Sequence, residues 1–385
     1  MCSKSAGEAL HPTETEESTR LAWGIHNDEF FPNYSKIYFL PKRETMKIDA
    51  FCHIMPRAYY DRFFQLGETK EAANLRKRVS NIPSMVDLDI RFKQMDEFGD
   101  YRQVINLASP PVETLGSRAL SKEMARLANE SMAQLVANHP DRFAGFFAAT
   151  PLDDPEAGIE EYNYAMGSLG AVGAQIYTHV HDKPMDLPEF EPFWENAAKS
   201  RGMIQVHPAR NSGWADYPTE ARSRYEIWWT LGWEYDLSVF QARLVFSGVL
   251  ERYPELKLLI HHGGSMIPHF AGRVGPGWDQ LGARTPEDQK ADVEHYPLSK
   301  RPIEYFKMMF ADTAMFGAGH ALRCSIDFYG ADHVLFASDS PFDPEKGPGY
   351  IRATIANMEE IGLSNVEKEK IYSDNAARLL GLKVS

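Results

Sequence analysis

The stretch "IDAFCHIMP", residues 48–56, begins as an apolar run and continues into Phe51, Cys52 and His53. Together with Met46 and Lys47 it has the composition of a buried β-strand. Seven further runs rich in β-branched and aromatic residues follow, at 102–107, 143–150, 171–177, 203–207, 256–261, 307–312 and 333–338. Polar or amphipathic stretches separate the runs, and residues 121–139 have a helical pattern. Eight strands alternating with helices predict an α/β fold, a (β/α)₈ barrel of the TIM type.

Two segments depart from this alternation. Residues 1–45 begin with a polar stretch that has the composition of a flexible tail, and we interpret them as an N-terminal extension. Residues 46–385 form the predicted barrel domain. Within it, the long connection from 208 to 255, after the fifth strand, contains an aromatic-rich insertion followed by a strong helical pattern.

The charge and the cysteines exclude several classes of protein. Lys and Arg number 41 against 54 Asp and Glu, a formal charge of −13 that repels nucleic acid and anionic membranes. No apolar run approaches the roughly 18 residues of a membrane span, and the start of the chain lacks a signal-peptide pattern. Cys2, Cys52 and Cys324 are widely spaced, which is typical of a reducing compartment. We therefore predict a cytoplasmic protein with neither a nucleic-acid nor a membrane partner.

Residues that bind metals or exchange protons cluster after the apolar runs. In a parallel barrel the chemistry lies at the carboxyl ends of the strands. The residues at those ends are Phe51, Cys52, His53, Asn106, Tyr177, Thr178, His179, His207, His261, His262, Asp312 and Asp339. We expect four of them, His53, His207, His262 and Asp339, to share one active site.

Other polar residues have simpler explanations. A single histidine is more often a hydrogen-bonded structural residue than a ligand. This interpretation is preferred for His179, His181, His269, His295 and His320. His333 precedes its strand, at the face that barrels use for stability, and is expected to be structural. Asp49 and Asp312 can equally cap helices or stabilise the barrel.

Five segments together resemble the amidohydrolase superfamily, in the branch called amidohydrolase family 2. They are "IDAFCHIMP", "NHPDRFAGFFAATPLDDP", "LVFSGVLERYPELKLLIHHGGSMIPHFAGR", "VLFASDSPFD" and "KIYSDNAARLLGL". The resemblance runs from about Met46 to Leu382 in the same order. The branch contains aminocarboxymuconate-semialdehyde decarboxylase and γ-resorcylate decarboxylase, so the resemblance implies a barrel enzyme with a divalent metal, zinc or manganese, and no organic cofactor.

The resemblance also implies a ligand set. The family's His-x-His pair on the first strand falls on Phe51 and His53, its ligand on the fifth strand falls on His207, and its ligand on the eighth strand falls on Asp339. Phe51 departs from the pattern because phenylalanine has no lone pair. Catalytic zinc sites need only three protein ligands, and His53, His207 and Asp339 still supply two imidazoles and a carboxylate. A metal site with three protein ligands and a metal-free site both stay open.

The family's catalytic histidine matches His262 rather than His261. With this choice, Pro268 and Arg273 keep the offsets that the family shows. An imidazole has a pKa near neutral pH and can exchange a proton with the substrate. The resemblance therefore implies that His262 and Asp339 are the catalytic residues.

The substrate is expected to be a small carboxylic acid. Arg57 and Arg210 are candidate carboxylate clamps, because a guanidinium presents a planar fork to a carboxylate. Arg273 matches an arginine that in the decarboxylase relatives reaches a neighbouring subunit's site, so a homodimer or larger homo-oligomer is expected. Trp214, with Trp228, Trp229 and Trp233, can form an aromatic wall of the pocket or simply pack the insertion. These features favour a planar aromatic or cyclic acid.

Three functions remain open on the sequence. The first is a carbon–carbon lyase that decarboxylates an aromatic or cyclic unsaturated carboxylic acid. The second is a hydrolase of a lactone, an amide or a ring C–N bond, since a metal-activated water serves hydrolysis equally well. The third is a catalytically silent ligand-binding barrel, which the loss of a ligand at Phe51 keeps open.

Overall fold

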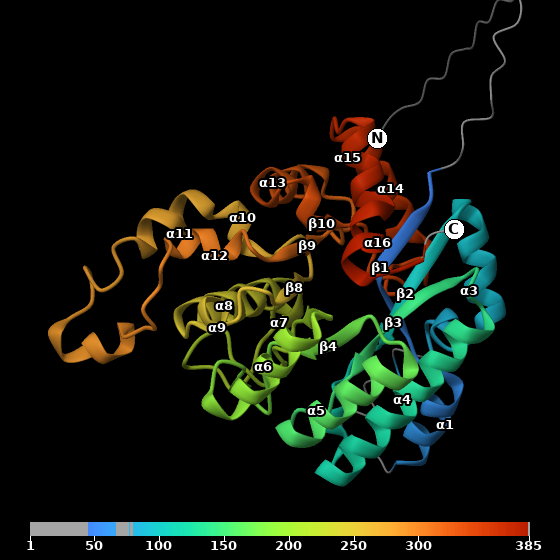
Figure 1. The fold of residues 1–385 in the computed structure, drawn as a ribbon, viewed down its shortest axis with the longest axis horizontal. Helices are drawn as coiled ribbons and strands as arrows, with labels where there is room; N and C mark the ends of the chain where they lie inside the picture. Colours follow the sequence, from blue (N-terminus) through green and yellow to red (C-terminus); the bar gives the residue numbers. More distant parts are fainter. Residues whose placement is uncertain (1–44, 67–76, 78–79, 384–385) are drawn as a thin grey trace, which may run out of the picture. The chain divides into compact units, whose positions relative to one another are not determined.

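Eight parallel strands form the core of the structure, a computed structural model that describes residues 45–66, 77 and 80–383. They follow one another in the order β1-β2-β3-β4-β7-β8-β9-β10 (Figure 1). Their bounds are Lys47–Ile54, Tyr101–Leu107, Phe143–Ala149, Gly173–Tyr177, Met203–His207, Lys257–Ile260, Phe310–Asp312 and Val334–Leu335. Two-residue strands β5 (His179–Val180) and β6 (Lys183–Pro184) form a separate antiparallel pair. Everything described belongs to the unit Glu44–Ser385, and the predicted extension over residues 1–45 lies outside the described residues except for Thr45.

Backbone hydrogen bonds between the first strand and the segment after β10 close the barrel. The amide of Ala50 donates to the carbonyl of Phe336, and the amide of His53 donates to the carbonyl of Ser340, both at 2.8 Å. The amide of Asp339 donates to the carbonyl of Phe51 at 3.1 Å. The last segment therefore lies beside β1, and the predicted (β/α)₈ barrel is confirmed.

The predicted strands match the structure closely, and the three largest differences concern the ends of β1, β9 and β10. β1 continues to Ile54, so Phe51 and His53 lie inside the strand rather than after it. β9 begins only at Phe310, because the preceding residues belong to helix α12 and its end. β10 stops at Leu335, and the chain beyond it follows β1 with irregular backbone.

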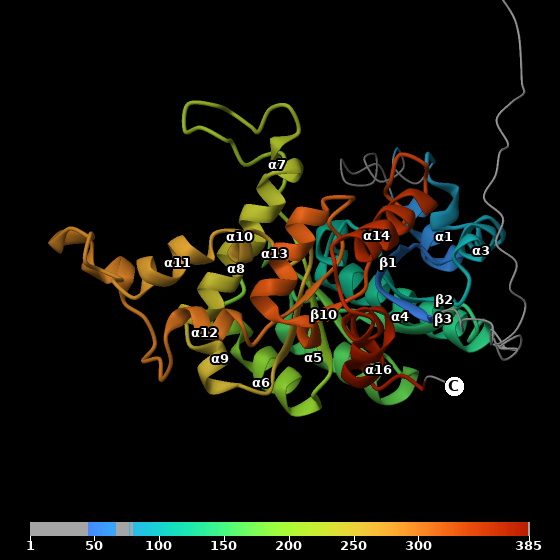
Figure 2. The same ribbon diagram turned by 90° about the horizontal axis from the view of Figure 1, so that it is seen from above.

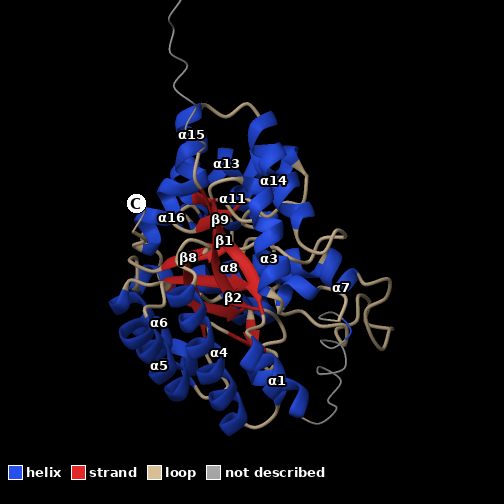
Figure 3. Ribbon diagram, turned by 90° about the vertical axis from the view of Figure 1, so that its right-hand side faces the viewer, coloured by secondary structure: helices blue, strands red, loops and turns tan. Residues whose placement is uncertain are grey.

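Helices surround the strands, as Figure 3 shows. Their bounds are α1 Arg57–Gln65, α3 Leu88–Met95, α4 Arg118–Asn138, α5 Pro155–Tyr164, α6 Glu191–Ser200, α7 Ile227–Thr230, α8 Gly232–Phe246, α9 Val249–Arg252, α10 Met266–His269, α11 Ala271–Trp278, α12 Pro302–Phe306, α13 Gly319–Tyr329, α14 Pro348–Glu360, α15 Asn365–Glu369 and α16 Asn375–Leu380. None of the described helices is both long and apolar enough to span a membrane.

Helix α4 illustrates how the sequence specifies these elements. Ser117 caps it, because its hydroxyl accepts a hydrogen bond from the amide of Leu120 at 3.3 Å. Met124, Ala128 and Met132 recur every four residues and are fully buried against the sheet side. This periodicity is that of an amphipathic helix, so the pattern predicted over 121–139 is confirmed with a start three residues earlier.

The apolar residues form two cores, one inside the barrel and one between the strands and the surrounding helices. A small inner core fills the barrel and includes Ile48, Val104, Phe147 and Leu259, with helix α16 packed against its lower end. A larger core lies between the strands and the surrounding helices. Full burial of one such side chain stabilises the fold by roughly 1.5–3 kcal/mol. The amino-terminal end of the barrel is therefore closed by packing, which leaves the carboxyl ends of the strands for polar side chains.

The insertion predicted after the fifth barrel strand is present. It connects β7 to helices α7, α8 and α9, and Figure 2 shows its first part extending away from the barrel before α7. Tyr217 and Tyr225 in that part are 69% and 81% exposed, whereas Leu237 and Leu244 in α8 are fully buried. Helix α8 thus anchors the insertion on the barrel.

Candidate functional site

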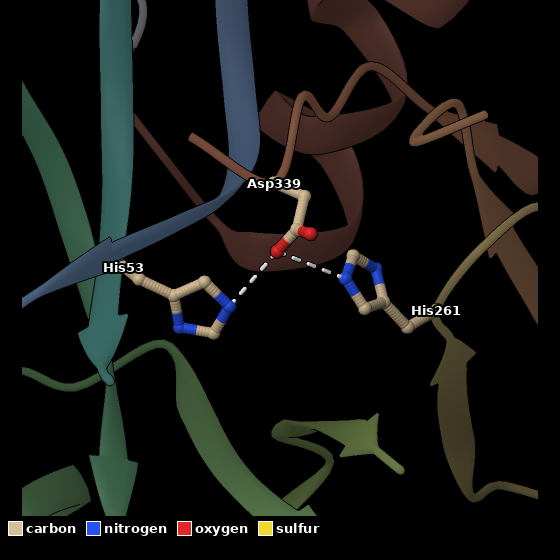
Figure 4. A group of neighbouring side chains, drawn as sticks. All are labelled: His53, His261 and Asp339. Atoms are coloured by element: carbon tan, nitrogen blue, oxygen red, sulfur yellow. Dashed lines mark ion pairs between the residues drawn. The ribbon is translucent and has the colours of Figure 1, made fainter. Parts of the chain in front are cut away.

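Three polar side chains from distant parts of the chain meet at the carboxyl end of the barrel. His53 lies on β1, His261 directly follows β8, and Asp339 follows β10 (Figure 4). Oδ1 of Asp339 lies 3.0 Å from Nε2 of His53 and 3.3 Å from Nε2 of His261. Both imidazoles are fully buried and the Asp339 side chain is 10% exposed. We call these residues the His–His–Asp group.

The second nitrogen of His261 is held by another carboxylate. Nδ1 of His261 lies 2.5 Å from Oδ2 of Asp312, and a carboxylate accepts, so Nδ1 carries the hydrogen. Oδ1 of Asp312 accepts from the amides of Gly263 and Ala314, both at 3.1 Å. Asp312 therefore orients His261 so that Nε2 faces Asp339, which gives this aspartate a role beyond stabilising the barrel.

Burial and the two carboxylates control the charges of the group. Burial lowers the pKa of His261, but Asp312 and Asp339 outweigh it and raise that pKa to about 10. Burial lowers the pKa of His53, and the contact with Asp339 offsets part of this effect. Burial acts to raise the pKa of Asp339, yet His261 and His53 hold that pKa well below its usual range. Asp339 is therefore an anion at neutral pH.

The donor atoms of the group fit a divalent cation. One ligand atom from each of the three residues lies within 4.8 Å of the others. Nε2 of His53 and Nε2 of His261 both face the single oxygen Oδ1 of Asp339, at distances of an ion pair, without the geometry of a well-aligned hydrogen bond. A buried polar atom without a partner is costly, and a bound cation satisfies such atoms. Two imidazoles and a carboxylate form a known set for catalytic zinc, and the same set suits manganese or iron.

His207, predicted as a ligand, lies beside this group rather than within it. Its ring centroid lies 5.3 Å from that of His53 and 6.0 Å from that of His261. Nδ1 donates to the carbonyl of Pro208 at 2.6 Å, so the lone pair of the neutral ring is on Nε2. Burial, and then the charges of His53 and His261, lower the pKa of His207 well below its usual range. The ring is therefore neutral at neutral pH.

His262, predicted as the catalytic histidine, lies outside the group, and His261 takes the central place. His262 has a left-handed backbone with φ of 56°, and its Nδ1 donates to the carbonyl of Ala314 at 3.2 Å. The catalytic role of His262 that the resemblance implies stays a prediction, and the structure shows only that His261, not His262, joins this group. The alternation along β8 was the better signal, because Leu259 faces the inner core and Ile260 the outer core, which turns His261 inward.

Phe51 fills the position where the family has its first ligand. Its ring is fully buried and stacks on His261, with centroids 3.6 Å apart and an angle of 12° between the planes. The ring also lies 5.2 Å from that of His53. Cys52 points to the other side of the strand, where its Sγ lies 3.8 Å from the hydroxyl of Tyr101. An apolar surface therefore replaces a donor on one side of the His–His–Asp group.

Among the described residues, the predicted substrate arginines contact residues other than the His–His–Asp group, and their substrate roles stay predictions. Arg57 is exposed and pairs with Asp61 at 3.0 Å, and Arg273 is exposed on α11. Nη2 of Arg210 donates to the carbonyls of Trp214 and Ala215, both at 3.3 Å, so Arg210 stabilises the insertion.

The aromatic wall of the site comes from residues other than Trp214. Trp214 stacks on His179 with ring centroids 4.9 Å apart. The tryptophan that faces the site is Trp233, whose ring lies 5.6 Å from that of His207. Phe342 lies 5.0 Å from the ring of His53, and Tyr177 lies 5.1 Å from that of His207. Ring spacings of this size are typical of packed aromatic contacts, so aromatic rings surround the site, and among them Trp233 is one of the predicted tryptophans.

Two residues with predicted structural roles have them. Nδ1 of His333 donates to the carbonyl of Met309 at 3.0 Å, and its ring stacks on Phe310. Asp49 accepts from the amide of Ser338 at 3.0 Å and from the hydroxyl of Tyr101 at 2.6 Å. Asp49 thus links the first and last segments of the barrel.

A (β/α)₈ barrel with a buried histidine–aspartate donor group at the carboxyl ends of its strands defines a class of barrel enzymes whose chemistry centres on a metal site. The chain belongs to the amidohydrolase family, whose model matches residues 48–382. The family predicted from the five segments is confirmed.

The relatives and structural neighbours include several decarboxylases. The chain is 31% identical to γ-resorcylate decarboxylase of Rhizobium sp. over 76% of this chain and 87% of that protein. It is 27% identical to 2-amino-3-carboxymuconate-6-semialdehyde decarboxylase of Dictyostelium discoideum, over 77% of each. A dihydroxybenzoic acid decarboxylase of Polaromonas, solved with manganese and the inhibitor 2-nitroresorcinol, is 26% identical, with a TM-score of 0.68 over 89% of this chain and 98% of that one. The predicted enzyme with decarboxylase relatives is therefore confirmed.

Proposed function

We propose that this protein is a carbon–carbon lyase that releases carbon dioxide from a hydroxylated aromatic carboxylic acid. The observation that carries the proposal is the buried His–His–Asp group with an aromatic wall, in a chain whose relatives are γ-resorcylate decarboxylases. The hydrolase has no such support, because the reported relatives are decarboxylases. The silent barrel is disfavoured because the histidine and aspartate donors of the group are retained and converge.

His53, His261 and Asp339 are the residues that hold the divalent cation in this proposal. Manganese is the first choice, because the Polaromonas neighbour contains it, and zinc is the second. A cation held there supplies electrostatic attraction for the oxygens of the substrate. Trp233, beside His207, supplies an aromatic ring near the site toward which a planar substrate ring packs, whereas Phe51 packs on His261 and lines the group with apolar surface.

In this proposal, histidines outside the His–His–Asp group transfer the proton. When the carboxylate leaves, the electron pair of the broken bond stays on the ring carbon, which then takes a proton. His207 and His262 lie on the same rim, and each has one nitrogen engaged by a backbone carbonyl. The other nitrogen of each ring is left for proton exchange.

The function is tested with the purified protein loaded with Mn²⁺. Carbon dioxide release is measured from a panel of hydroxylated benzoates, and hydrolysis of lactones and amides is measured in parallel. The proposal expects release of carbon dioxide from at least one acid and no hydrolysis. Hydrolysis without carbon dioxide release from any acid would refute it.

The Mn²⁺ affinity of two variants tests which ligand set is correct, the His–His–Asp group of the structure or the set implied by the resemblance. We expect His261→Gln to lower Mn²⁺ affinity by roughly 10- to 100-fold or more, because it removes a member of the group, whereas His207→Gln retains the metal. Calorimetric titration of the two variants with Mn²⁺ measures this. Loss of the metal in His207→Gln alone would instead support the ligand set implied by the resemblance.

Phe51 is expected to limit metal affinity. Phe51→His places a lone pair where the ring now stacks on His261, so Mn²⁺ affinity should rise about tenfold, or about 1.4 kcal/mol. Phe51→Leu is the matched control, since it removes the ring and adds no donor. Titration with Mn²⁺ compares the two variants, and equal affinities would contradict a missing-ligand role for this position.

The ligand in this proposal is a small aromatic acid. It stays a prediction that the protein forms a homodimer or larger homo-oligomer in which Arg273 reaches the neighbouring copy. The exposed position of Arg273 on α11 is compatible with such a contact. Sedimentation of the wild type and of Arg273→Ala measures it. The cytoplasmic location and the domain boundary at residue 45 also stay predictions.

A further inference from the structure

Two further aromatic side chains, Phe316 and Tyr350, continue the rings of the site from His262 to the surface. The ring of Phe316 lies 5.2 Å from that of His262, with an angle of 64° between the planes. The ring of Tyr350 lies 4.3 Å from that of Phe316, at an angle of 32°. His262 is 4% exposed, whereas Phe316 is 40% exposed. Phe316 therefore contacts a buried histidine of the rim and still has part of its ring free.

Both aromatic residues belong to the end of the barrel that carries the site. Phe316 lies in the loop after β9, and Tyr350 is in the first turn of α14, the helix that follows β10. Such loops and helix starts lie at the carboxyl ends of the strands. The start of α14 is also bound to the segment after Asp339, because Oδ1 of Asp343 accepts from the amide of Gly349 at 3.1 Å.

Hydrogen bonds fix the loop of Phe316 to the histidines of the site. The carbonyl of Ala314 accepts from Nδ1 of His262 at 3.2 Å, and the amide of Ala314 donates to Oδ1 of Asp312 at 3.1 Å. Oδ2 of the same Asp312 accepts from Nδ1 of His261 at 2.5 Å. One carboxylate thus orients His261 and places the loop that carries Phe316.

The backbone of Phe316 adopts a conformation that a phenylalanine rarely adopts. Its φ is 51°, in the left-handed region, and the next residue, Gly317, has φ of 95°. Glycine adopts this region without steric cost, whereas a bulky side chain is strained there. Residues held in such conformations cluster at functional sites. A partly exposed phenylalanine at a position that suits glycine therefore indicates that its ring has a use at the site.

We propose that Phe316 determines specificity by contacting the aromatic ring of the substrate beside His262, and that Tyr350 positions it. This inference rests on the proposed function and deepens it. A planar ring next to His262 packs against the free part of Phe316 at the spacing of aromatic pairs. A saturated ring of the same size lacks the matching aromatic geometry, so the contact favours aromatic acids. Phe316 takes no part in breaking the carbon–carbon bond, so it acts on affinity.

Steady-state kinetics of the full chain loaded with Mn²⁺ test this contact. We expect Phe316→Ala to raise the KM of an accepted aromatic acid about tenfold and to leave kcat within about threefold. Tyr350→Ala should raise KM less, and Tyr350→Phe, which retains the ring, should keep the wild-type value. Phe270→Ala is the matched control, because Phe270 is also 40% exposed but lies between α10 and α11. An unchanged KM in Phe316→Ala would overturn the proposal.

A ligand that cannot lose carbon dioxide tests the contact without turnover. The probe is 2-nitroresorcinol, a planar dihydroxylated ring that has no carboxylate. Calorimetric titration should give a Kd about tenfold higher in Phe316→Ala than in the wild type or in Phe270→Ala. Phe316→Gly should weaken binding equally while its unfolding temperature is unchanged or higher, because glycine relieves the strain of the backbone. Wild-type affinity in Phe316→Gly would contradict the contact.

The results separate this inference from the proposed function. If no acid releases carbon dioxide but binding of 2-nitroresorcinol depends on Phe316, the proposed function fails and the aromatic contact stands. If carbon dioxide is released and Phe316→Ala changes neither KM nor probe affinity, the contact fails and the proposed function stands. A wild-type protein that neither binds the probe nor releases carbon dioxide would overturn both.

Discussion

Asp339→Asn is expected to lower carbon dioxide release by roughly 10²- to 10⁴-fold, the range of a lost acid, base or charge at a reacting centre. Asp339 is the only carboxylate of the His–His–Asp group, and its Oδ1 lies within 3.3 Å of both imidazole Nε2 atoms. Asparagine keeps the shape of the side chain and removes its charge. The cation then loses its anionic ligand, so Mn²⁺ affinity should also fall by more than the roughly 10- to 100-fold typical of outer partners.

Turnover and Mn²⁺ titration of the same preparation measure the two effects. Asp327→Asn is the control, because it removes an aspartate charge from an exposed pair with Arg323. Thermal unfolding of both variants verifies that the fold is retained. A turnover of Asp339→Asn within a few-fold of the wild type would show that the group is not the reacting centre.

Arg91→Met is expected to lower the free energy of unfolding by about 3–5 kcal/mol, because three buried neutral acceptors lose their donor. Arg91 is 2% exposed, and its guanidinium donates to Oε1 of Gln103 at 2.7 Å, to the carbonyl of His53 at 2.9 Å and to the carbonyl of Ser84 at 3.3 Å. Methionine fills a similar length but leaves all three acceptors buried without this donor. Each unsatisfied acceptor costs about 1–3 kcal/mol.

Denaturant unfolding measures this loss, with Arg57→Met as the control. The Arg57 side chain is 74% exposed and pairs with Asp61 on the surface, so its replacement should change stability by less than about 0.5 kcal/mol. Because Arg91 binds the backbone of His53 itself, Arg91→Met should also weaken Mn²⁺ binding in the protein that remains folded. A stability change below about 1 kcal/mol would contradict the assigned role of this buried arginine.

Strand order and the polar rim could be predicted from local patterns. Apolar runs of strand length identify β1, β2, β3, β4, β7 and β8 to within a few residues, because burial on both faces requires continuous apolar sequence. The predicted lengths of β9 and β10 were too long, because the residues that flank these short strands are equally apolar but do not belong to them. The convergence of His53 and Asp339 follows from the barrel, which brings the carboxyl ends of all strands to one face.

Side-chain direction beyond the strand ends could not be predicted in this way. Which of His261 and His262 faces Asp339 depends on a left-handed backbone at His262, and motif spacing does not contain that conformation. Likewise, Arg210 binds the insertion itself and Trp214 stacks on His179, while Trp233 turns toward His207. The path of an insertion depends on contacts with residues far away in sequence.

The sequence by itself determined the barrel, the family and the chemical types of the residues at its rim, because apolar periodicity and motif order are local properties of the chain. Only the tertiary structure decided that His261 joins His53 and Asp339 and that Phe51 stacks on it. These relations depend on the three-dimensional direction of each side chain, which long-range packing sets.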